Sequence, residues 1–114
     1  MTVKDWLKKM VKERIYIDRT GIVHKVQDIR PRLYCNDGFS VSVQASEFHY
    51  CEPRRDGVRN YKSVELRVPS VEDELIRDYS EDDFDDPDYP DIVYKYVPIE
   101  IVEKLIEKHG GIKT

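Results

Sequence analysis

The sequence predicts a single α+β domain over residues 1–114, with an antiparallel sheet of four to five strands and an N-terminal and a C-terminal helix packed on one face. Apolar residues recur at helical spacing at the two ends of the chain. Between them lie β-branched and aromatic runs separated by short turns, and short connections favour antiparallel pairing. A chain of 114 residues suits one domain.

The first helix is expected over residues 3–12. Thr2 can serve as its N-cap, and Asp5 follows three positions later in a capping-box pattern. Lysines occupy one side of this segment. The other side is apolar, through Val3, Trp6, Leu7 and Met10.

A first hairpin is expected from residues 14–18 and 22–26, which are rich in β-branched and aromatic residues. The intervening Arg19-Thr20-Gly21 is a turn sequence.

A second hairpin turns at Asn36-Asp37-Gly38, which suits a three-residue loop with glycine in the left-handed position. This loop pairs Leu33 with Val41 on an apolar face. The same register places three polar side chains on the opposite face, where we expect solvent or a ligand: Arg30, Arg32 and Gln44.

The second half of the chain predicts two more strands and a helix. Residues 61–68 alternate between apolar and polar side chains, which is typical of a half-buried strand. Residues 92–97 form the next strand, and Pro98 begins a helix that runs to about His109. Gly110-Gly111 ends it.

Charge is divided unevenly along the chain. Residues 72–91, the acidic segment, contain eleven acids and one base, a net charge of −10. Because the whole chain has a net charge of −4, the remainder carries +6. The part from 80 to 91 has two prolines and little apolar content, so a solvated loop is expected there.

The segment from Gln44 to Arg59 concentrates side chains that suit a phosphorylated ligand. Arginine forks match phosphate oxygens, and Tyr or His rings can stack on a base. The alternative is a polar hairpin end whose arginines pair with the acidic segment. The candidate ligand-binding residues are Gln44, His49, Tyr50, Arg54, Arg55 and Arg59, with Arg30 and Arg32 as outer contacts.

Other chemistry is less well specified. His49, Cys51 and Cys35 offer three zinc ligands where a closed structural site needs four. The same His49 and Cys51 offer a base and a nucleophile, but their spacing does not require contact. We expect free cysteines, no metal, no cofactor and no catalytic residue.

The acidic segment supports a different function. A dense run of carboxylates can imitate a nucleic-acid backbone and dock on a basic protein, with aromatic side chains as anchors. The residues that would make this contact are Asp82, Asp83, Phe84, Asp85 and Asp86. The same charge would repel nucleic acid itself.

Three segments resemble a family of small uncharacterised phage and prophage proteins of Firmicutes: DGFSVSVQASEFHYCEPRRD (37–56), YKSVELRVPS (61–70) and VYKYVPIEIVEKLIEKHGGI (93–112). The resemblance covers the chain from about Asn36 onward and implies no catalytic residues. It implies an antagonist of host defence in the bacterial cytoplasm. Such proteins include oligomeric sponges for nucleotide immune signals and acidic inhibitors of CRISPR nucleases.

The sequence therefore favours a non-enzymatic protein that sequesters a small phosphorylated or nucleotide-like ligand. The alternative is an acidic inhibitor of a host defence protein. We expect a homo-oligomer, because an antiparallel sheet leaves one face open. No run of about 18 apolar residues exists, so no membrane partner is expected.

Overall fold

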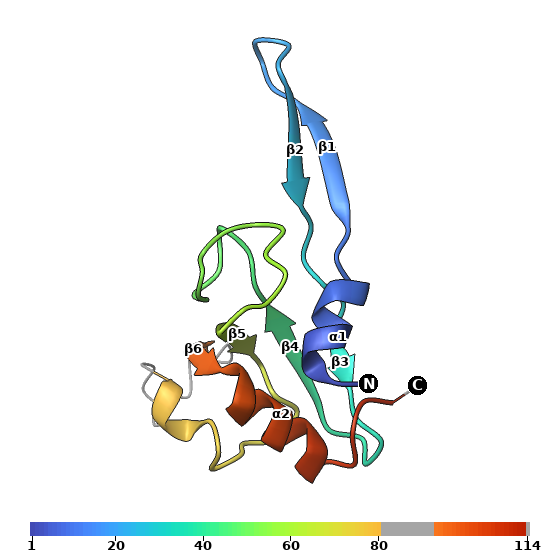
Figure 1. Cartoon of the computed structure of the whole chain (residues 1–114), viewed down its shortest axis with the longest axis vertical. Coiled ribbons are helices and arrows are strands. Elements are labelled where there is room, and N and C mark those ends of the chain that lie inside the picture. The colour runs from blue at the N-terminus through green and yellow to red at the C-terminus, as the bar shows by residue number, and fades with distance from the viewer. Residues whose placement is uncertain (81–92, 114) are drawn as a thin grey trace.

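The computed structural model describes residues 1–80 and 93–113, and these have an α+β fold (Figure 1). Within these residues there are two helices and six strands, and all strand pairings are antiparallel. The predicted fold class is confirmed, including a helix near each end of the chain. In chain order the elements are α1 (Val3–Lys9), β1 (Glu13–Ile17), β2 (Val23–Gln27), β3 (Leu33–Tyr34), β4 (Ser40–Gln44), β5 (Ser63–Arg67), the 3-10 helix η1 (Arg77–Tyr79), β6 (Val93–Pro98) and α2 (Ile99–Lys108).

The main sheet has four strands in the order β3-β4-β5-β6. Leu33 pairs with Val41, as the apolar pattern of the second hairpin predicts. The turn beyond that pair is closed by the N–H of Cys35, which donates to the carbonyl of Phe39 at 2.8 Å. Side-chain alternation and turn chemistry are therefore sufficient to determine this register.

The two helices form because each has a capped start and an apolar stripe. Thr2 Oγ1 accepts a hydrogen bond from the N–H of Asp5 at 3.1 Å, which confirms the predicted N-cap of α1. In α2 the buried stripe begins directly after Pro98. The core beneath both helices is built from β-branched, leucine and aromatic side chains of all four main-sheet strands.

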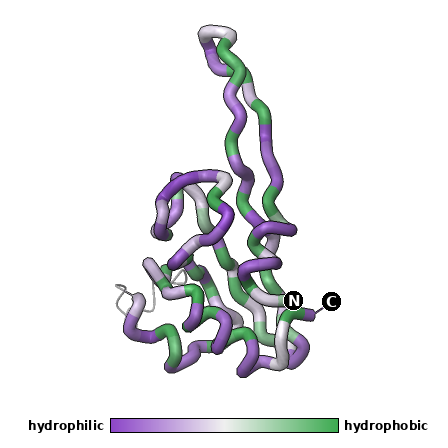
Figure 2. Tube along the Cα trace, in the orientation of Figure 1, coloured by the Kyte–Doolittle hydropathy of each residue, from purple (hydrophilic) through white to green (hydrophobic). Residues whose placement is uncertain are grey.

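The first hairpin forms a sheet of its own. Strands β1 and β2, with their turn, are here called the arm, which projects away from the rest of the molecule (Figure 1). Every residue of β1 is exposed, and apolar and polar residues are interspersed along both strands (Figure 2). The predicted turn and pairing are confirmed, and the main sheet contains four strands without the arm.

The predicted solvent-facing polar positions of two strands are buried. Arg30 and Gln44 both lie inside: Arg30 Nε donates to the carbonyl of Leu7 in α1 at 3.0 Å, and the Gln44 amide bonds the backbone of Arg30. In β5, Glu65 has a side chain that is only 1% exposed. The loop that carries His49 lies over it, so the expectation of a half-buried strand is wrong here.

No helix in the described ranges combines the length and the apolar character that crossing a membrane requires.

Candidate anion-binding site

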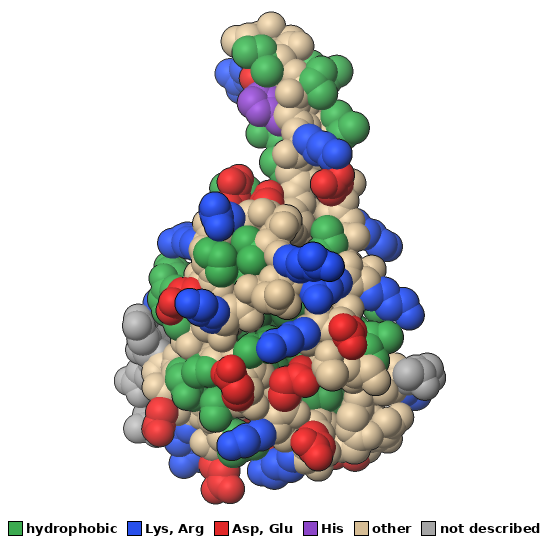
Figure 3. Space-filling view, in the orientation of Figure 1, with side chains coloured by type: hydrophobic (Ala, Val, Ile, Leu, Met, Phe, Trp, Pro, Cys, Tyr) green, Lys and Arg blue, Asp and Glu red, His purple; other side chains and the backbone are tan. Residues whose placement is uncertain are grey.

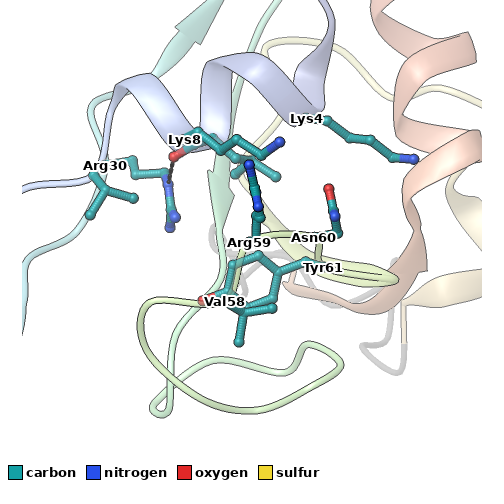
Figure 4. A pocket seen from close by; sticks show the side chains of 9 residues that line it. Lys4, Lys8, Arg30, Val58, Arg59, Asn60 and Tyr61 are labelled. Atoms are coloured by element: carbon teal, nitrogen blue, oxygen red, sulfur yellow. Dashed lines mark hydrogen bonds between the residues drawn. The ribbon is translucent and has the colours of Figure 1, made fainter.

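A shallow pocket between α1 and the loop before β5 is lined by four cations and no acid (Figure 4). We call it the basic pocket. Its polar lining is Lys4, Lys8, Arg30, Arg59, Asn60 and Tyr61, and its apolar lining is Leu7, Val11 and Val58.

The helix brings two of these cations together. Lys4 and Lys8 stand four positions apart, so they lie one turn from each other on the same side of α1. Leu7 is buried in the core and fixes that side of the helix at the pocket. In Figure 4, Lys8 lies over Arg59, which points up from the loop toward the helix.

The loop is held by a buried tyrosine. The Tyr61 hydroxyl donates to the carbonyl of Arg55 at 2.6 Å, and its ring is part of the core. This bond ties the loop to itself just before β5 begins. Arg59 and Asn60, immediately before Tyr61, are exposed and line the pocket.

Arg30 supplies a buried positive charge at the pocket. Its Nη1 donates to the carbonyl of Ala45 at 2.8 Å, and its guanidinium lies 6.0 Å from the centroid of the Tyr61 ring. Burial lowers the pKa of Arg30, although an arginine remains charged at neutral pH. Among the described residues no carboxylate lies within ion-pair distance of it, so its positive field favours an anion nearby.

The pocket is small and its outer cations are unpaired. Its interior has about 10 Å³, which is room for roughly one water molecule. A ligand would therefore place one oxygen inside and rest at the mouth. Within residues 1–80 and 93–113, no ion pair involves Lys4, Lys8 or Arg59. Figure 3 shows many Lys and Arg side chains on the surface below the arm, with Asp and Glu side chains among them.

The structure separates the sequence-predicted ligand residues into several groups. Arg30 and Arg59 reach the basic pocket. Gln44 instead bonds the backbone of Arg30, accepting from its N–H and donating to its carbonyl, each at 2.8 Å. Arg32 donates to the hydroxyl of Ser40 at 2.9 Å and is only partly exposed.

A second group surrounds Tyr50. The guanidinium of Arg54 and the ammonium of Lys95 lie 5.1 Å and 4.6 Å from its ring centroid. The ring of Tyr96 meets it edge-on at 5.9 Å. We call these four residues the Tyr50 cluster. Two cations already contact this half-buried ring, so less of the ring face remains for stacking on a nucleotide base.

His49 belongs to a third group, with Ser46 and Glu65. Ser46 Oγ and His49 Nδ1 are 2.5 Å apart, and His49 Nε2 lies 3.9 Å from Glu65 Oε2. The residue types are those of a hydrolase, but Ser46 is 2% exposed, so its hydroxyl does not face a substrate. Burial is the main influence on His49 and lowers its pKa, against the opposing effect of Glu65.

The two cysteines are buried and unbridged. Burial raises the pKa of the Cys51 thiol, which donates to the carbonyl of Ser46 at 3.2 Å. A thiol held in its protonated form is a poor nucleophile. Across the part of the chain that the structure describes, no three His, Cys, Asp or Glu side chains gather at metal-binding distance.

Two of the cations that line the basic pocket lie outside the set of predicted ligand-binding residues. Lys4 and Lys8 were not expected in a site, because the sequence places them more than 50 residues from Arg59. Their spacing on one helix side was the available signal. The acidic-segment contacts Asp82, Asp83, Phe84, Asp85 and Asp86 lie outside the described residues.

Comparison with known proteins gave no relative of this chain: no family model, no curated protein and no solved structure matches it.

Proposed function

We propose that this protein is a non-enzymatic binding protein that holds a small phosphorylated, nucleotide-type ligand at the basic pocket. The observation that carries the proposal is the convergence of Lys4, Lys8 and Arg59, three exposed cations, around the buried charge of Arg30. Phosphate is the biological anion that such a set of Lys and Arg donors matches best.

The arrangement assigns a role to each part of the pocket. Lys8 and Arg59 approach from two elements and hold the phosphate between them. Asn60 adds a neutral donor at the rim. Val11 and Val58 offer apolar contact for the rest of the ligand. The charge of +6 outside the acidic segment attracts an anion to this part of the molecule.

Sequestration of an immune signal is the biological setting that we propose. It rests on the resemblance of residues 37–56, 61–70 and 93–112 to phage proteins, and on the cationic lining of the basic pocket, which includes no serine, threonine or cysteine. A protein that sequesters a signal needs affinity and abundance, and it needs no turnover.

The test is titration calorimetry with inorganic phosphate, mononucleotides and cyclic dinucleotides. We expect at least one nucleotide to bind, and the double variant Lys8→Gln/Arg59→Gln to weaken that binding more than about tenfold, because two charge-assisted hydrogen bonds are lost. Both side chains are exposed, so the fold should be retained.

The matched control is Arg54→Gln/Arg55→Gln, which removes the same two charges from exposed positions away from the pocket. It should bind as the parent protein does. Loss of binding in this control alone would move the ligand to the Tyr50 cluster and overturn the pocket assignment. Absence of binding to every phosphorylated compound would overturn the function.

The alternative candidate is an inhibitor that docks the acidic segment on a basic host protein. The charge of −10 over residues 72–91 favours it.

A further inference from the structure

The outer edge of the arm is an unpaired strand with an apolar surface. Among the described residues β1 pairs with β2 alone. Ile15 and Ile17 are 66% and 68% exposed, although isoleucine is among the residues most often buried. Figure 3 shows hydrophobic side chains along this projecting part of the molecule. An isolated two-stranded hairpin is only marginally stable in water, and a further strand would stabilise it.

The backbone of β1 is oriented to accept another strand. The N–H of Asp18 donates to the carbonyl of Ile22 at 3.0 Å across the arm. Asp18 directly follows β1, and backbone groups alternate in direction along an antiparallel strand. Tyr16 and Arg14, two and four residues before Asp18, therefore also direct their backbone groups toward β2. The N–H and C=O groups of Glu13, Ile15 and Ile17 therefore point outward. No described residue bonds to them.

The sequence of this edge is complementary to itself. Residues 13–19 read ERIYIDR, and a second copy laid antiparallel about Tyr16 matches a partner to every position. Ile15 meets Ile17, Tyr16 meets its own copy, and Arg14 meets Asp18, which directly follows β1. Glu13, which also lies 2.7 Å from Lys25 within the arm, meets Arg19, the first residue of the turn. Opposite charges and paired apolar side chains at facing positions each stabilise an antiparallel pair.

We propose that two copies of this chain associate through β1, edge to edge and antiparallel, about a two-fold axis at Tyr16. The two arms then form one continuous four-stranded sheet in the order β2-β1-β1-β2. Ile15 and Ile17 of opposite copies exchange the outward-pointing backbone hydrogen bonds, and the two Tyr16 residues form the closer, non-hydrogen-bonded pair.

Other pairings of the arm are less complementary. A register centred on Ile15 sets Glu13 against Ile17 and leaves Arg19 without an acid. The edge of β2 carries a single charged residue, Lys25, which is already paired with Glu13 of the same arm at 2.7 Å, and this edge offers no acid to a second copy. The N–H of Gln27 on that edge is already bonded to Asp56 at 3.3 Å.

Charge reversal at the proposed interface tests the partner. Glu13→Arg alone, or Arg19→Glu alone, sets like charges opposite each other twice per dimer. Glu13→Arg also removes the ion pair with Lys25 within the arm, so Arg19→Glu is the cleaner variant of the two. Each variant should therefore associate about tenfold or more weakly than the parent chain. An equimolar mixture of the two variants restores both opposite-charge pairs. We expect sedimentation velocity to show a dimer for the parent chain and for the mixture, and mainly monomer for each variant alone.

Cysteine crosslinking tests the register. Facing residues of a non-hydrogen-bonded pair have Cα atoms about 4.5 Å apart, which a disulfide can span. Tyr16→Cys should give a covalent dimer under mild oxidation. Val23→Cys, at a position 62% exposed on β2, is the matched control and should stay monomeric in denaturing electrophoresis. Circular dichroism of each variant checks that the fold is retained.

Three outcomes would overturn the proposal. The first is a parent chain that stays monomeric into the millimolar range. The second is association that neither charge reversal weakens. The third is crosslinking of Ile15→Cys or Val23→Cys in place of Tyr16→Cys, which would mean a different register or a different strand. The nucleotide titration above uses other residues, so the two proposals fail independently.

Discussion

Asp73 joins two segments that are far apart in the sequence. Its carboxylate accepts hydrogen bonds from the N–H of Leu75 at 3.0 Å, from Lys108 Nζ at 3.2 Å and from His109 at 3.1 Å. Burial alone would raise the pKa of Asp73, but these bonds together outweigh it and hold the pKa below its ordinary value. The loop before η1 is thereby fastened to the C-terminal end of α2.

Asp73→Asn should lower the free energy of unfolding by about 1–3 kcal/mol, because a buried, charge-assisted network loses its anion. Chemical denaturation at pH 7 measures this. The matched variant Asp78→Asn removes a charge from an exposed position nearby and should stay within about 0.5 kcal/mol of the parent. Equal effects of the two variants would contradict the role of the network.

The sign of the pH dependence follows from the lowered pKa. A carboxyl with a folded-state pKa below its unfolded value stabilises the protein fully above the unfolded value, which is 3.8 for aspartate. That stabilisation is lost as the pH falls below 3.8 toward the folded-state pKa. The difference between Asp73→Asn and the parent chain should therefore shrink in this acid range.

Among the elements, the arm depends on its turn more than on packing. The Asp18 carboxylate accepts from the N–H of Thr20 at 2.8 Å and of Ile22 at 3.0 Å, and it lies 2.6 Å from His24 Nε2. Side-chain hydrogen bonds, first from Thr20 and then from His24, lower the pKa of Asp18 to about 2. None of the described residues that form the hydrophobic core belongs to β1 or β2, so core packing does not hold the arm.

Asp18→Ala should disorder the arm and leave the main sheet intact. Amide exchange measured by NMR should speed up along β1 and β2, with little change in β4 and β5. Asp28→Ala, at the base of the arm, removes the same charge from outside the turn and is the control. Slower or unchanged exchange in the arm of Asp18→Ala would contradict this role.

In the parent chain, the contribution of Asp18 to the stability of the arm is full above pH 3.8 and is lost as the pH falls toward 2.

For the molecule as a whole, the division between a −10 segment and a +6 remainder separates the two candidate functions. If the acidic segment docks on a basic protein, binding weakens steeply with salt. It is also lost when Asp82, Asp83, Asp85 and Asp86 become Asn. Pull-down of CRISPR nucleases at increasing salt measures this. Salt-insensitive binding of the Asn variant would contradict the inhibitor.

Local features of the sequence determined much of the fold. The N-cap at Thr2, the start of α2 after Pro98 and the pairing of Leu33 with Val41 all follow from residues within about ten positions of one another. At that range, capping groups, turn chemistry and side-chain alternation are sufficient to specify an element. The self-complementary run 13–19 can also be found in the sequence, but only the structure shows that it lies on an unpaired strand edge where a second copy could bind.

Only the tertiary structure decided which polar side chains form a site. The Gln44 side chain bonds the backbone of Arg30 in the interior. Lys8 and Arg59, about 50 residues apart in the sequence, line the same pocket. Alternation along a strand predicts which residues share a face, but not whether a helix covers that face. The loop that carries His49 buries Glu65, and α1 completes the basic pocket, so both arise from packing between segments that are distant in sequence.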